Sequence, residues 1–101
     1  MGQNVWVKCG TVRNLFEEPG ATATGVSDFK YKDSPGATYH ATVTGTGAVT
    51  ATIAIEMSND GVNALETVAG TITLSGTTSS TDGFATDAAW KYVRANVIAL
   101  T

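Results

Sequence analysis

Cysteine and histidine are scarce in this 101-residue chain, which contains one of each. The single cysteine, Cys9, cannot form an intrachain disulfide or a cysteine-based metal cage. A catalytic base needs a positioned partner and a substrate pocket, and the lone His40 has neither in its sequence surroundings. No serine lies in a nucleophile-elbow pattern, and Gly45 and Gly47 are followed by neither a lysine nor a helix that would complete a phosphate loop. We therefore expect no catalytic residues, no cofactor, no metal ion and no enzymatic activity.

Charged residues and long apolar runs are also few. Charged side chains make up 15% of the chain, the net charge is -3, and the six basic residues are scattered. Because proteins bind phosphate backbones through clustered lysine and arginine, we expect no nucleic acid partner. The start Met-Gly-Gln-Asn lacks the basic and apolar regions of a signal peptide, and no apolar run is long enough to cross a bilayer. We expect a soluble protein, folded in a reducing cytosol, with no membrane partner.

Threonine, alanine and glycine dominate the composition, and valine and isoleucine supply most of the larger apolar positions. Branched side chains lose less rotamer freedom in a strand than in a helix, so this composition favours a pleated sheet. A chain of this length can bury one modest core. The sequence therefore predicts a single all-β domain over residues 1–101.

The central stretch, 38–57, shows the clearest pattern in the chain. Apolar and polar residues alternate with a two-residue period, which is typical of strands with one buried face. We interpret this stretch as two strands joined by a short turn at Gly45-Thr46-Gly47. Similar patterns predict further strands over 4–9, 26–32, 65–74 (with an interruption at 69–70) and 90–100, the last of them central or in contact with a neighbour. Strands separated by turn signals predict a small antiparallel β-sandwich or a jelly-roll-like barrel.

Three segments lack a strand pattern. Residues 11–25 are irregular and broken by Pro19-Gly20, and we interpret them as an extended N-terminal arm or long loop. Residues 75–87 are rich in Gly, Ser, Thr and Asp around one large residue, Phe84, and predict a surface loop. Ser58-Asn59-Asp60-Gly61 offers too few alternating oxygen ligands for a calcium loop, so a turn explains it better.

Most of the aromatic residues are expected in the core or at sandwich edges, because large aromatic side chains dominate small cores. Some of them could instead form a sugar-stacking platform or anchor a protein interface. The residues that we select as candidate interface residues are Leu15, Phe16, Phe29, Tyr31, Trp90, Tyr92 and Arg94.

Four stretches in the second half of the chain form a pattern of turn and strand residues that resembles a known family. They are IAIEMSNDG at 53–61, GTITLSG at 70–76, TDGF at 81–84 and WKYVRA at 90–95. In this order they resemble small β-rich structural proteins of tailed-phage and prophage virions, and most of all capsid decoration (cement) proteins. The resemblance implies a non-enzymatic virion protein, assembled in the host cytoplasm, that binds the outside of the capsid. Its implied partner is the phage major capsid protein, and the protein is implied to be a homo-oligomer or arrayed on the shell.

A cement protein stabilises the shell because it binds assembled subunits better than free ones, so mass action favours the intact shell. In this reading, we hypothesise that the arm at 11–25 reaches onto a neighbouring subunit. Leu15 and Phe16 are its candidate apolar anchors.

Two alternative functions stay open at the level of sequence. The Trp-x-Tyr-Val-Arg strand also occurs in discoidin-like sandwiches, which makes a carbohydrate-binding module the main alternative. In that case loop aromatic residues, Asp82 and Asp87 are expected to contact the sugar. A minor tail component of a virion is the other alternative.

Overall fold

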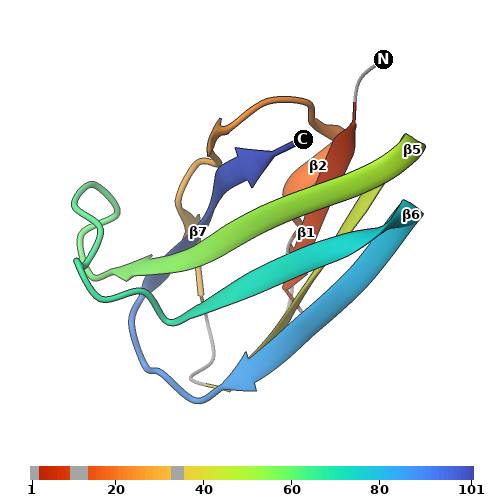
Figure 1. The fold of residues 1–101 in the computed structure, drawn as a ribbon. Coiled ribbons are helices and arrows are strands. Elements are labelled where there is room, and N and C mark those ends of the chain that lie inside the picture. The colour runs from red at the N-terminus through yellow and green to blue at the C-terminus, as the bar shows by residue number, and fades with distance from the viewer. Residues whose placement is uncertain (1–2, 10–13, 33–35) are drawn as a thin grey trace.

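Every element of the protein is a β-strand in the part of the chain that the structure describes, which comprises residues 3–9, 14–32 and 36–101 of a computed structural model (Figure 1). The predicted all-β class is therefore confirmed. The strands are β1 (Asn4–Cys9), β2 (Asn14–Ala21), β3 (Gly25–Val26), β4 (Lys30–Tyr31), β5 (Ala37–Ser58), β6 (Gly70–Thr86) and β7 (Tyr92–Leu100).

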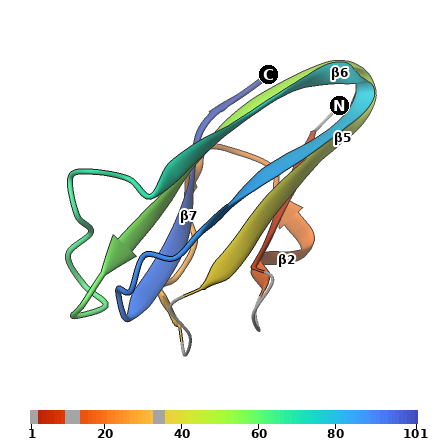
Figure 2. The same cartoon turned by 90° about the horizontal axis from the view of Figure 1, so that it is seen from below.

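All the strand pairs are antiparallel, and together they form one curled sheet in the order β2-β1-β5-β7-β3, with β4 on β7 and β6 on β5. The long strands β5 and β6 pair with each other and bend together, so that their two halves face each other as two arms (Figures 1 and 2). The N-terminal half of β5 also pairs with β1, and its C-terminal half pairs with β7. The result is a half-barrel whose two arms pack against each other as the layers of a small sandwich do.

The bend in β5 lies at 45–47, where the sequence predicted a hairpin turn. The pairing with β6 jumps there from Thr44 opposite Ser79 to Ala48 opposite Thr77, so residues 45–47 face Thr78 alone. Extra residues on one strand bend and twist a ladder. Thr78 has a φ of 72°, a left-handed conformation that branched residues rarely adopt. The predicted hairpin turn is wrong, because the glycines here form a corner within one continuous strand and do not reverse the chain.

The predicted surface loop at 75–87 is also wrong, because most of it belongs to β6. This strand pairs with β5 from Gly70 opposite Ile55 to Thr86 opposite Ala37. A small residue is needed within it at Gly83, where an added Cβ would overlap the carbonyl oxygen of Tyr39. The connection between β5 and β6 runs over 59–69. Of the strand predicted over 65–74, only residues 70–74 are therefore in a strand, at the start of β6.

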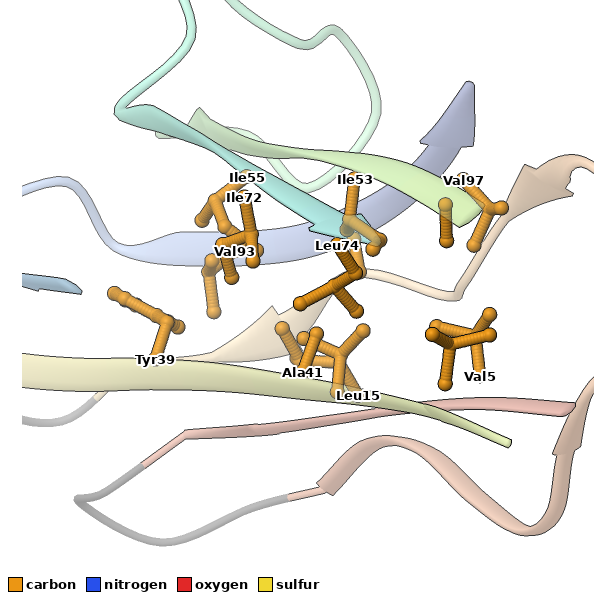
Figure 3. Close-up of a cluster of buried hydrophobic side chains, with 14 of the residues drawn as sticks. Val5, Leu15, Tyr39, Ala41, Ile53, Ile55, Ile72, Leu74, Val93 and Val97 are labelled. Atoms are coloured by element: carbon orange, nitrogen blue, oxygen red, sulfur yellow. The ribbon is translucent and has the colours of Figure 1, made fainter. Parts of the chain in front are cut away.

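The core lies between the two arms and is filled by alternating apolar side chains (Figure 3). Strand β1 has the predicted bounds, whereas β7 begins at Tyr92, two residues after the start of the strand predicted over 90–100. Alternate residues are buried in both strands, namely Val5 and Val7 in β1 and Val93, Ala95 and Val97 in β7. Strand β7 is central, with β5 on one edge and β3 and β4 on the other, as expected. The labelled residues of one layer in Figure 3 are Val5, Leu15, Tyr39 and Ala41, and they face Ile53, Ile55, Ile72, Leu74, Val93 and Val97.

The segment predicted as an extended arm contains β2, which pairs with β1. Leu15 is only 4% exposed and belongs to the core of this same domain, while Phe16 packs half-buried against it. The expectation that Leu15 anchors an arm on a neighbouring subunit is therefore corrected. Residues 11–13 of the predicted arm lie outside the described residues. The strand predicted at 26–32 is present only as the short strands β3 and β4.

Phe84, in the second half of β6, lies against the first residue of the same strand. An added Cβ at Gly70, the first residue of β6, would overlap the Phe84 ring. The same ring packs against Tyr39, with 5.6 Å between the ring centroids. One aromatic side chain thus contacts both arms of the bent strand pair.

The close approach at Gly83 gives a test of the β5–β6 pairing. We expect Gly83→Ala to lower the free energy of unfolding by about 1–3 kcal/mol, because the added methyl group forces the two backbones apart. The matched control is Gly47→Ala at the exposed corner, where the added Cβ meets no atom within 4 Å. That control is expected to change stability by no more than about 0.5 kcal/mol in urea unfolding. Equal losses for both variants would contradict the close pairing at Gly83.

Candidate functional site: an aromatic and arginine cluster on the outer face of β7

Strand β7 positions a group of side chains on the outer face of the sheet. Its residues Val93, Ala95 and Val97 point into the core, so the alternate residues point outward. Among the latter, Tyr92 lies opposite Tyr31 of β4. The two tyrosine rings meet edge to face, with centroids 5.9 Å apart and an interplanar angle of 76°. This arrangement is a favourable one for aromatic pairs and fixes both rings.

Arg94, the next outward residue of β7, is held by contacts on several sides. Its guanidinium group lies over the Phe29 ring, 4.6 Å from the centroid. Its Nε donates a hydrogen bond to Oε1 of Glu56, the residue directly opposite on β5, at 2.6 Å. Nδ2 of Asn96 donates to the other carboxylate oxygen of Glu56 at 3.1 Å. The Arg94 and Glu56 side chains are only 23% and 14% exposed, so this charge-assisted pair is partly withdrawn from water and well oriented.

The turn that follows β5 borders this group. An added Cβ at Gly61 would lie 3.4 Å from the Tyr92 ring, and Oδ1 of Asn59 accepts a hydrogen bond from the backbone N–H of Lys91 at 3.3 Å. Gly61 has a φ of 71°, a conformation that glycine adopts without strain. The prediction of a turn at this place is confirmed.

Asp60 organises that turn. Its Oδ1 accepts hydrogen bonds from the backbone N–H groups of Val62 and Asn63 and from the Ser58 hydroxyl, each at 2.8 Å. Its Oδ2 accepts a further bond from Nδ2 of Asn63. These donors hold the pKa of the Asp60 carboxyl well below its usual range, the backbone N–H groups of Asn63 and Val62 having the largest effect.

The structure brings together Phe29, Tyr31, Tyr92 and Arg94 from the predicted interface residues. We call these residues, with Glu56 and Asn96, the β7 outer cluster. Tyr31 is 51% exposed, so its ring is the part of the cluster most accessible to solvent, while Phe29 and Tyr92 are partly buried. Trp90 precedes β7 and is 37% exposed, whereas Leu15 and Phe16 lie in or against the core and do not join the cluster.

Glu56 and Asn96 were missed at the sequence level. The alternation of β5 places Glu56 on the outer face, but its role depends on which strand lies beside it. Only the register of β5 with β7 shows that Glu56 lies opposite Arg94.

His40, Tyr39 and Cys9 also have reactive side chains, and they belong to strand pairs that do not include β7. His40 is exposed on β5 opposite Gly83 of β6. Burial raises the pKa of the Tyr39 phenol well above its usual range, and the neighbouring Cys9 raises it further, so Tyr39 stays protonated. Within 3–9, 14–32 and 36–101, no three His, Cys, Asp or Glu side chains are grouped so that they could hold a metal ion. The same ranges contain no helix that is long and apolar enough to span a membrane.

Comparison with known proteins gives no significant match to a family model, a curated protein or a solved structure.

Removing the charge of Glu56 tests whether the cluster is preorganised. We expect Glu56→Gln to lower the free energy of unfolding by about 1.5–3 kcal/mol, because Arg94 loses its charged partner in a partly buried position. The matched control is Glu66→Gln in the exposed connection between β5 and β6, with an expected change of no more than about 0.5 kcal/mol. Urea unfolding of both variants measures the difference. No difference between them would mean that the ion pair does not hold the cluster.

The lowered pKa of Asp60 predicts a pH-dependent contribution to stability. A carboxyl whose pKa is lower in the folded state stabilises the fold above its unfolded pKa of about 3.9, and this stabilisation is lost as the pH falls through the folded-state value. We expect Asp60→Ala to be less stable than the wild type at pH 7, with a difference that shrinks steadily below about pH 4.

Thermal unfolding followed by circular dichroism from pH 7 to pH 2 measures the effect of Asp60. Asp87→Ala is the control for the loss of an exposed acidic side chain. A difference between Asp60→Ala and the wild type that stayed constant over this pH range would rule out the proposed hydrogen-bonded carboxylate.

Proposed function

We propose that this protein is a non-enzymatic virion structural protein that binds the outside of a tailed-phage capsid and stabilises the shell through protein–protein contacts. The observation that carries the proposal is the β7 outer cluster, in which the exposed Tyr31 of β4 packs on Tyr92 of β7 beside Arg94, whose guanidinium is held by Glu56 and Phe29. Tyrosine and arginine are enriched among the residues that dominate protein interfaces. Side chains that are already fixed lose little conformational entropy on binding.

The resemblance to decoration proteins supports the same proposal. Its four stretches fall on the end of β5 with its turn, on two parts of β6, and on 90–95 at the start of β7. Strand β5 pairs with both β6 and β7, so these stretches belong to one connected part of the sheet. The cluster residues Glu56, Tyr92 and Arg94 lie within them.

The contacts within the cluster fit an adhesive surface better than a sugar site. A sugar site needs polar groups available for hydrogen bonding, but both carboxylate oxygens of Glu56 already accept hydrogen bonds, one from Arg94 and one from Asn96. Asp82 lies in the other arm, opposite Ala41, while Tyr92 lies opposite Ser58. The carbohydrate-binding alternative expected loop aromatic residues, Asp82 and Asp87 to contact the sugar, and the placement of Asp82 in the other arm from Tyr92 favours this alternative less.

Binding to shells tests the proposal directly. Capsids of the phage or prophage whose genome encodes this chain, prepared without it, are mixed with the purified protein and sedimented. We expect saturable binding and a higher melting temperature of the loaded shell, because the protein binds the assembled state preferentially. We expect Tyr31→Ala to weaken binding about tenfold or more, as loss of an interface hot spot does.

The matched control for binding is Thr46→Ala. Thr46 is exposed at the corner of β5, which lies beside β6 and not beside β7. This variant is expected to bind as the wild type does. Failure of the wild-type protein to bind the shells would overturn the proposal. Saturable quenching of tryptophan fluorescence by a soluble glycan, with no shell binding, would favour the carbohydrate-binding alternative.

A further inference from the structure

Strand β6 has one edge with no pairing strand among the residues that the structure describes. It spans 17 residues and pairs with β5 on its other edge. The other outermost strands are shorter, with two residues each in β3 and β4 and eight in β2. A long edge strand exposes backbone N–H and C=O groups to which another strand can bind. Edge strands that stay unpaired usually carry charges or proline, which make such binding unfavourable.

The backbone groups that face away from β5 can be identified from the hydrogen-bond pattern. Thr50 of β5 exchanges both of its backbone bonds with Thr101, on the β7 side. Direction alternates along an antiparallel strand, so Ala51 and Ile53 bond toward β6, where they face Leu74 and Ile72. The intervening residues of β6 therefore direct their N–H and C=O groups outward. These residues are Thr71, Thr73 and Ser75.

The two halves of this edge differ in charge. The C-terminal half contains Asp82, whose carboxylate accepts a hydrogen bond from the backbone N–H of the next residue, Gly83, at 2.8 Å. That donor is occupied, and a strand approaching there would also meet a negative charge. In contrast, residues 70–77 carry no charge and no proline. Inward-facing Ile72 and Leu74 are buried, while the side chains of the outward set are exposed hydroxyls.

We propose that residues 71–75 of β6 pair antiparallel with the same residues of a second copy of the chain, around a two-fold axis at Thr73. The three outward residues are symmetric about this position, so Thr73 would face Thr73 of the second copy and Thr71 would face Ser75. Each such pair exchanges two backbone hydrogen bonds. On the exposed face, the hydroxyl side chains of one copy would lie beside those of the other. On the buried face, Ile72 of one copy would lie beside Leu74 of the other.

A second copy fits this edge better than an unrelated strand for a physical reason. Identical uncharged edges pair without like-charge repulsion, and a two-fold axis satisfies both edges at once. The edge offers no charge that would select a partner of opposite sign. The pairing uses β6 and leaves the β7 outer cluster free, so it does not depend on the proposed capsid function.

Sedimentation equilibrium of the full chain, from micromolar to millimolar concentration, tests this pairing. We expect a concentration-dependent rise from the monomer mass of 10.4 kDa to twice that value. Thr73→Pro removes an outward N–H without removing a bond to β5, and proline is tolerated at such edge positions. We expect this variant to associate at least tenfold more weakly while its β-type circular dichroism spectrum is kept. Thr73→Ala keeps the N–H and is expected to associate as the wild type does.

Amide hydrogen exchange of the wild-type protein gives a second, independent measurement. The N–H groups of Thr71, Thr73 and Ser75 are expected to exchange slowly at millimolar concentration and to lose this protection on dilution, with Leu74 protected throughout. A wild-type protein that is monomeric at every concentration would overturn the proposal. So would association that persists in folded Thr73→Pro, or protection of these amides that is independent of concentration.

Discussion

The pairing of β5 with β6 around a shared bend is the interaction on which the rest of the structure depends. One strand pair supplies a layer on each side of the core, so the two layers are covalently continuous. Strand β1 adds to one half of β5 and β7 adds to the other. Without the bend the same strands would form a flat sheet with apolar side chains exposed on one face. Burial of that face is the main favourable free energy of folding in a domain of this size.

The sequence predicted the faces of the strands better than their ends. A two-residue period is local, and it identified β1 and the buried alternate residues in both halves of β5. It also predicted the last strand, β7, but not which of its two faces is buried. The turn at 58–61 was also predictable, because Ser, Asn, Asp and Gly form turns through their own hydrogen bonds and backbone freedom. Each of these signals acts over a few residues.

The wrong predictions share a physical cause, which is that a partner strand decides the outcome. Glycines at 45 and 47 favour a turn locally, but pairing with β6 on both sides keeps β5 continuous. Small polar residues at 75–86 favour a loop, yet β5 pairs with all of them except Thr78 at the corner. In the predicted arm, Leu15 faces the core only because β2 lies beside β1. The same cause applies to the β7 outer cluster. Its aromatic residues could be selected from the sequence, but the pairing of Glu56 with Arg94 depends on the register between β5 and β7.

The corner at 45–47 sets the phase of every residue that follows it in β5. Side chains alternate between two faces, so an odd change in the length of this corner would turn Val49, Ala51 and Ile53 toward solvent unless the corner itself absorbed the change. An even change keeps the phase and alters only the angle between the layers. Length variation at the corner should therefore be tolerated mainly in steps of two residues, which would vary the shape of the half-barrel while its interior composition stays the same.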